Sequence, residues 1–144
     1  MAFTFVAGLL LLIAMRAPAY SKDIGFSPTR FPVEAAQAVD PLPSNARIVA
    51  SDLYGGYLIY SFDGARKVFF DGRSDFYGAD FMKRYLVLIT AQPGWQEIAR
   101  SYGFTHALLP NDSALKAALE QAGWVTLHRD GVATLLALHQ REAR

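Results

Sequence analysis

The sequence contains no cysteine. Disulfide bonds, thiolate nucleophiles and zinc–thiolate sites are therefore excluded, while the redox environment of the chain stays open. The histidines His106, His128 and His139 are far apart and lack the spacing of metal ligands, so we expect no metal site.

An excess of charge of either sign is also missing. Fourteen Lys and Arg side chains stand against thirteen Asp and Glu side chains, which gives a net charge of +1, and the basic residues form no stripe. This balance argues against a nucleic-acid partner held by bulk electrostatic attraction. At 144 residues and 52% hydrophobic, the chain can build the core of one domain.

The familiar catalytic patterns are absent as well. There is no glycine-rich phosphate loop of the Walker or dinucleotide type, so no cofactor is expected. Ser51, Ser74 and Ser113 lack a nucleophile elbow and a nearby pattern of Asp and His. The sequence therefore contains no complete catalytic constellation.

What the sequence does contain is an uncharged start, Met1 to Met15, closed by Arg16. As a helix this run spans about 22 Å, roughly five residues short of a bilayer core of about 30 Å. Four readings stay open: the last part of a transmembrane helix, a short anchor, a signal peptide ending near Ala17-Pro18-Ala19, or a buried core helix. We favour a membrane helix, or its C-terminal part, over residues 1–16, with the membrane as a partner.

The segment that follows is rich in proline and small polar residues, which predicts a linker over residues 17–31. One α/β domain then covers 32–139, and 140–144 form a tail. Helices are predicted from apolar spacing and capping residues at Pro32–Val39, Leu53–Phe62, Gly78–Ala91, Pro93–Tyr102 and Ala114–Ala122. Strands are predicted at Arg47–Ala50, Lys67–Asp71, Thr105–Leu109, Trp124–Arg129 and Val132–Leu138.

Strands separated by helices predict a small three-layer α/β sandwich, with a mostly parallel sheet and helices on both faces. The last two strands flank Asp130-Gly131, the strongest hairpin signal in the chain. We therefore expect a C-terminal antiparallel β-hairpin at the edge of this sheet.

The stretch FFDGRSDFYG, residues 69–78, is the leading candidate for a ligand site. It follows a predicted strand, and open α/β sheets bind ligands outside the carboxyl ends of their strands. The Arg73 guanidinium can bind a phosphate or carboxylate, and Asp71, Asp75 and the Tyr77 hydroxyl add polar groups. Gly78 opens the next helix, whose first amides can also hold an anion.

The structural alternative for this stretch is equally concrete, and we favour it. Arg73 can pair with Asp71 or Asp75 and close the loop, with Gly72 at a positive φ. Neither acid has a partner base in the loop, so nothing there requires hydrolysis.

The segment Tyr54-Gly55-Gly56-Tyr57 is a second candidate. Tyrosine rings and hydroxyls suit a sugar-binding surface, although packing of Tyr54 and Tyr57 in the core is the favoured alternative. The glycine pair predicts that another segment packs closely against the backbone of this helix.

Four segments, YGGYLIY, VFFDGRSDFYG, PGWQEIARSYGFTHALLP and GWVTLHRDGVATLLAL, carry a resemblance that covers residues 32–138. They resemble the C-terminal extramembrane domain of bacterial multi-spanning membrane proteins. Those proteins are similar to C-superfamily glycosyltransferases, the polyprenyl-phosphate-sugar-dependent kind related to protein mannosyltransferases. The motif positions, whose roles are unassigned, are Tyr54, Gly55, Gly56, Tyr57, Asp71, Gly72, Arg73, Asp75, Tyr77 and Gly78.

The resemblance implies that the catalytic acids of such enzymes lie in an external loop between early transmembrane helices, so no catalytic residue transfers to this chain. The expected function is a non-catalytic accessory domain of a membrane glycosyltransferase-like protein in the bacterial inner membrane. It would contact a glycan acceptor or a polyprenyl-linked sugar on the periplasmic or extracellular side, although Arg16 and Lys22 by themselves favour a cytoplasmic tail. A free-standing membrane-anchored binding or scaffold module is the alternative. A small enzyme acting through Asp71, Arg73 and Asp75 ranks third.

Overall fold

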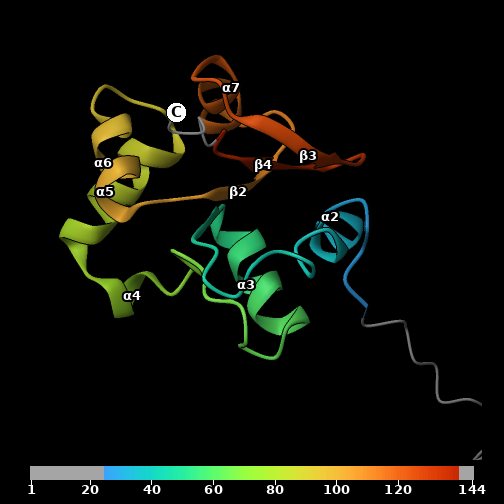
Figure 1. The fold of residues 1–144 in the computed structure, drawn as a ribbon. Coiled ribbons are helices and arrows are strands. Elements are labelled where there is room, and N and C mark those ends of the chain that lie inside the picture. Colours follow the sequence, from blue (N-terminus) through green and yellow to red (C-terminus); the bar gives the residue numbers. More distant parts are fainter. Residues whose placement is uncertain (1–24, 140–144) are drawn as a thin grey trace, which may run out of the picture.

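The computed structural model of the protein describes residues 25–139, which form one mixed α/β unit (Figure 1). The helices in this range are α2 (Val33–Gln37), α3 (Asp52–Ser61), α4 (Ser74–Tyr77), α5 (Ala79–Ile89), α6 (Trp95–Tyr102) and α7 (Ala114–Gln121). The strands are β1 (Ile48–Ala50), β2 (His106–Pro110), β3 (Val125–Arg129) and β4 (Ala133–Ala137).

The four strands form one sheet in the order β1-β2-β4-β3. Only β1 and β2 are parallel, with Ile48 opposite His106. Strand β4 runs antiparallel to both β2 and β3, so the sheet is mostly antiparallel, and the prediction of a mostly parallel sheet was wrong. The predicted C-terminal hairpin at the edge of the sheet is confirmed: β4 pairs with β2, and β3 is the edge strand.

Burial explains this placement of the hairpin. Residues 133–136 in β4 are all buried, and Leu135 and Leu136 form a continuous apolar run that suits a strand covered on both faces. In contrast, β3 is the exposed edge, with Val125 46% and Leu127 50% exposed. A bulge between Thr126 and His128 interrupts the register of β3 with β4.

The segment Lys67–Asp71 is not the predicted strand. Only Val68 forms a bridge, parallel to Ile48, and the Phe69 amide donates to the Ile48 carbonyl at 3.3 Å. The chain then leaves the sheet and lies on α3: a Cβ added to Gly55 would stand 1.9 Å from the Phe70 carbonyl oxygen. Backbone packing on this glycine therefore replaces further strand pairing, and it is the close approach that the glycine pair predicts.

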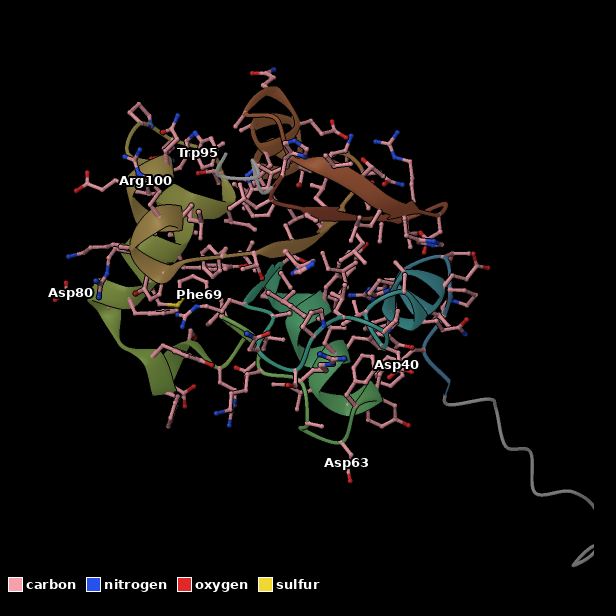
Figure 2. The ribbon with its side chains drawn as sticks, in the orientation of Figure 1. Asp40, Asp63, Phe69, Asp80, Trp95 and Arg100 are labelled. Atoms are coloured by element: carbon pink, nitrogen blue, oxygen red, sulfur yellow. The ribbon has the colours of Figure 1, made fainter. Side chains whose placement is uncertain are left out.

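Hydrophobic side chains cover both faces of the sheet. On one face, α2 and α3 pack over Ile48, Leu108 and Leu135. On the other face, α5, α6 and α7 pack over Val49 and Leu136, among other residues (Figure 1). The partly buried Phe69 joins this second cluster, whereas Asp80 on α5 points outward (Figure 2).

No helix within residues 25–139 is long and apolar enough to cross a membrane. The expected membrane segment 1–16, the linker residues 17–24 and the tail 140–144 lie outside the described range. In the described part of the expected linker, Phe26 contacts Phe31 and Tyr57, with ring centroids 4.6 Å and 4.9 Å apart. These residues therefore pack against α3.

Candidate functional site

The motif loop, residues 71–78, lies beside the start of α3. A Cβ added to Gly72 would stand 3.9 Å from the Cβ of Asp52, the first residue of that helix. Since α3 directly follows β1, the loop sits near the carboxyl end of β1, at the edge where open α/β sheets bind ligands.

An ion pair closes this loop. The Asp71 Oδ2 accepts hydrogen bonds from Arg73 Nε at 2.8 Å and from Arg73 Nη2 at 2.5 Å. Its Oδ1 accepts from the Arg73 backbone amide at 3.3 Å, and Gly72 between them has φ +86°. These bonds lower the pKa of Asp71 below its ordinary value. The loop therefore has the geometry of the structural alternative, in which Arg73 pairs with Asp71 and Gly72 takes a positive φ.

The two partners of this ion pair differ in exposure. The Asp71 side chain is 4% exposed, whereas the Arg73 side chain is 64% exposed. The Arg73 guanidinium carbon lies 5.3 Å from the ring centroid of Phe76, which is itself 74% exposed. The outer surface of the loop therefore carries the Arg73 guanidinium beside the Phe76 ring. The Asp71 carboxylate faces inward and is paired with Arg73.

Asp75 and Tyr77 lie on the short helix α4, which the sequence did not predict. Asp75 is exposed in its first turn. The Tyr77 ring stacks on Phe81 at 4.7 Å and meets Phe70 edge-on at 5.1 Å, and burial followed by the Asp71 charge raises the Tyr77 pKa. Gly78, with φ +78°, turns the chain from α4 into α5. Tyr77 therefore serves mainly as an aromatic contact between the loop and α5.

Tyr54 and Tyr57 are both buried in α3. The Tyr54 hydroxyl donates a hydrogen bond to the Val132 carbonyl at 3.1 Å, and burial raises its pKa. The Tyr57 ring packs against Phe26 and Phe31. Neither ring forms an exposed surface, which favours core packing over a sugar-binding role for this pair.

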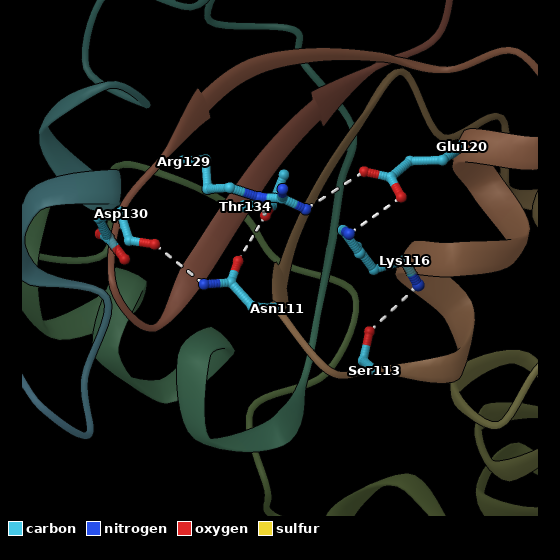
Figure 3. A network of polar contacts seen from close by, with 7 residues as sticks. All are labelled: Asn111, Ser113, Lys116, Glu120, Arg129, Asp130 and Thr134. Carbon is cyan, nitrogen blue, oxygen red and sulfur yellow. Dashed lines mark hydrogen bonds and ion pairs between the residues drawn. The ribbon is translucent and has the colours of Figure 1, made fainter.

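A polar network near the carboxyl end of β2 joins α7 to the hairpin (Figure 3). Thr134 Oγ1 donates to Asn111 Oδ1 at 2.6 Å and accepts from Arg129 Nε at 3.1 Å. Arg129 and Lys116 both pair with the Glu120 carboxylate, at 3.5 Å and 2.9 Å. Because these polar groups satisfy one another's hydrogen bonds and charges, we interpret the network as a structural link between α7 and the hairpin, and not as a reaction centre.

His106 and possible metal ligands are the remaining candidates in the described part of the chain. His106 Nδ1 lies 2.8 Å from the Thr105 hydroxyl, and burial lowers the His106 pKa. Within residues 25–139, no group of three or more His, Cys, Asp or Glu side chains is placed to hold a metal ion.

Sequence reasoning missed a cleft of about 520 Å³ at the opposite, amino end of β1. The polar residues on its lining include Ser44, Asn45, Arg47 and Lys67. Its aromatic lining residues are Phe69, Phe81, Tyr102 and Phe104.

One signal for this cleft was present in the sequence. Arg47 and Lys67 are each the first residue of a predicted strand, and the parallel bridge between Ile48 and Val68 brings the two cations to the same end of the sheet.

The cleft and the motif loop share a wall. Phe81 stacks on Tyr77 of the loop and lies 4.9 Å from Phe69, which lines the cleft. Phe69 in turn meets Tyr102 at 4.5 Å and Phe104 at 5.0 Å. A disturbance of the loop is therefore expected to reach the cleft through Phe81.

No protein-family model matches the chain, and no curated protein or solved structure matches it either.

Proposed function

We propose that this chain is a non-catalytic accessory domain of a membrane glycosyltransferase-like protein. In this proposal residues 1–16 anchor the chain in the bacterial inner membrane, and the domain stands on the periplasmic or extracellular side. The domain contacts the glycan acceptor or the polyprenyl-linked sugar, while the chemistry occurs elsewhere in the parent protein.

One observation carries the proposal. The buried Asp71 carboxylate is occupied by Arg73, whose guanidinium is exposed beside Phe76. An occupied acid is poorly suited to proton transfer, because its pKa lies below the ordinary value. An exposed guanidinium beside an aromatic ring, however, suits contact with a sugar or a phosphate. The loop that bears the motif thus fits a contact surface better than a catalytic centre.

The alternative is a free-standing membrane-anchored binding or scaffold module. The cleft that Arg47 and Lys67 line favours it, because a ligand-sized cavity in this domain needs no attached enzyme.

The size of the native polypeptide separates the two functions. An antibody against residues 22–144 is used to blot membranes of the source cells. A membrane-bound band several times larger than 15.9 kDa supports the accessory domain. A band at 15.9 kDa contradicts it and supports the free-standing module.

Substitution of Arg73 then tests the contact role of the loop. Arg73→Lys keeps the charge but loses the planar fork, and Arg73→Ala removes both. If the loop contacts the substrate, both variants lose sugar transfer in source-cell membranes while the protein level stays normal. Arg84→Ala, an exposed arginine on α5, is the matched control. Transfer that falls only in proportion to protein abundance would show a purely structural brace.

A further inference from the structure

The cleft at the amino end of β1 has cationic groups without anionic ones. Arg47 and Lys67 line it, and none of the residues from 25–139 that line it is an Asp or Glu. Neither cation takes part in an ion pair with another residue of that range. Two like charges on one cavity repel each other, and a bound anion relieves this repulsion.

The backbone around Arg47 is fixed. Its amide donates to the Thr105 hydroxyl at 3.0 Å, and its carbonyl accepts from the amides of Thr105 and His106 at 3.0 Å and 3.2 Å. A Cβ added to Gly103 would stand 3.8 Å from Arg47 Nε, so the arginine side chain lies along this glycine. Arg47 is thus held at the end of the sheet with its side chain laid over the end of α6.

A second arginine holds another part of the cleft lining. Arg66 donates hydrogen bonds to the carbonyls of Asp40, Leu42 and Pro43 at 2.5, 2.7 and 2.9 Å. These bonds tie the loop that leads to Ser44 and Asn45 onto the residue next to Lys67. Ser44 and Asn45 are therefore preorganised relative to Lys67.

The apolar side of the cleft consists of aromatic rings. Phe69 and Tyr102 are partly exposed, and they meet edge to face at 4.5 Å. Aromatic faces bind sugar rings and hydrocarbon chains through their C–H groups. The volume of about 520 Å³ is in the range of small-molecule sites.

We propose that this cleft binds an organic phosphate. The phosphate lies between the Arg47 and Lys67 side chains, with Ser44 and Asn45 as further donors, and its sugar ring or hydrocarbon chain lies against Phe69 and Tyr102. A phosphate suits this arrangement because its tetrahedral oxygens accept from two cations at once and an arginine can bind two of them. The inference stands on the cleft alone and does not require that the chain belong to a glycosyltransferase.

Isothermal titration of the 144-residue chain in non-ionic detergent tests the inference. The probes are glucose 1-phosphate, farnesyl phosphate and inorganic phosphate, with glucose and farnesol as their uncharged counterparts. We expect at least one organic phosphate to bind about ten-fold or more tightly than both inorganic phosphate and its uncharged counterpart. Preference for glucose 1-phosphate identifies a sugar phosphate site, and preference for farnesyl phosphate a lipid phosphate site. Organic phosphates that bind no better than inorganic phosphate would overturn the proposal.

Variants locate the binding. Arg47→Gln and Lys67→Gln are each expected to weaken binding about ten-fold, since a hydrogen bond to a charged group contributes at least this factor. Arg100→Gln and Lys83→Gln remove exposed cations outside the cleft and are expected to bind like the parent chain. If all four variants bind alike, the phosphate does not occupy this cleft. If circular dichroism shows that Arg47→Gln is unfolded, Arg47→Lys replaces it. Lysine keeps the charge and a long aliphatic stem but cannot bind two phosphate oxygens with a planar fork, so weaker binding is still expected.

Discussion

The Asp130 carboxylate and the Ala35 backbone amide are joined by a hydrogen bond of 3.0 Å across 95 positions of sequence. Through this bond Asp130 Oδ2 accepts from the first turn of α2, where Pro32 at the N-cap position has no acceptor side chain. Asp130 Oδ1 accepts from the amides of Val132 and Ala133 at 2.8 Å and 2.7 Å. One carboxylate therefore closes the hairpin turn and fastens α2 to it.

Replacement of Asp130 by asparagine is expected to destabilise the protein. The asparagine side chain retains only one acceptor oxygen. Either the backbone N–H of α2 or the backbone N–H groups of the turn therefore lose their partner. The free energy of unfolding should fall by about 1–3 kcal/mol, the cost of an unsatisfied buried donor. Guanidinium denaturation measures the free energy of unfolding. Asp63→Asn, at an exposed turn position with φ +48°, should change it by less than about 0.5 kcal/mol. Equal stability of the two variants would show that the Asp130 bonds contribute nothing.

Alanine at Gly55 is expected to be severely destabilising. Its Cβ would stand 1.9 Å from the Phe70 carbonyl oxygen, and this neighbour is backbone that cannot rotate away. Overpacking of this kind costs typically about 1–3 kcal/mol and more where backbone must shift, as it must here. Thermal melting of the variant measures the loss.

Gly56→Ala is the matched control on the same helix. Its Cβ would meet the Asp71 carbonyl oxygen at 3.5 Å, an ordinary contact, while alanine is favoured over glycine in a helix by about 1 kcal/mol. We therefore expect an unchanged or raised melting temperature. Equal effects at the two glycines would contradict the close approach of residues 70–71 to α3.

Local patterns in the sequence were enough to place most of the elements. Asp130-Gly131 marked the hairpin, and Gly94 and Gly103 flank α6 as left-handed residues near its predicted ends. The α4 turn was missed because four residues are too few for a periodic signal.

The direction of the strands was not predictable in this way. Leu135 and Leu136 form a continuous apolar run, which indicates a strand buried on both faces but not its neighbours. The Phe69-Phe70 run gave the same signal, yet the chain there packs on Gly55 instead of joining the sheet. Pairing partners depend on contacts between distant segments, which apolar patterns do not encode.

The same distinction applies to the candidate site. The Asp71–Arg73 pair lies within one short loop, so its residue types could suggest it. The cleft of Arg47 and Lys67 depends on the alignment of two segments that are distant in sequence. Ligand sites in open α/β sheets are expected at the carboxyl ends of strands, whereas this cleft lies at the amino end of β1.

The stability contributed by Asp71 should depend on pH. Hydrogen bonds from Arg73 hold the pKa of Asp71 below its ordinary value of 3.8. A carboxyl with a lowered folded-state pKa contributes stability above pH 3.8, which is lost as the pH falls through the lower folded-state value. The difference in stability between the parent chain and Asp71→Asn should therefore be largest near neutral pH and shrink in acid. A constant difference for Asp71→Asn would contradict the pairing.

Tyr85 should make the protein sensitive to alkaline pH. Its hydroxyl accepts from the Asp52 amide at 2.9 Å, and burial, followed by the Asp52 charge, raises the Tyr85 pKa to about 12. Because the folded-state pKa exceeds the ordinary 10.0, the stability from the neutral phenol is complete below pH 10 and is lost as the pH rises through about 12. Difference spectra of tyrosinate absorbance should show that Tyr85→Phe lacks this late-titrating group. Tyr60→Phe, 69% exposed in the parent chain, should retain it.

Arg66 should control both the stability of the domain and the shape of the cleft. Its guanidinium reaches the carbonyls of Asp40, Leu42 and Pro43 together, which the single ammonium of a lysine cannot do. For Arg66→Lys we expect a loss of about 1.5–3 kcal/mol in the free energy of unfolding. Amide hydrogen exchange should accelerate in residues 40–47, and the organic phosphate should bind more weakly although Arg47 and Lys67 are intact.

The matched control is Arg100→Lys, an exposed arginine on α6. It should change neither the exchange of residues 40–47 nor the phosphate affinity. If Arg66→Lys lowers stability but leaves the affinity unchanged, the rim that Arg66 holds is not part of the phosphate site. Binding would then depend on Arg47, Lys67 and the aromatic wall, and the preorganisation assigned to Arg66 would serve folding alone.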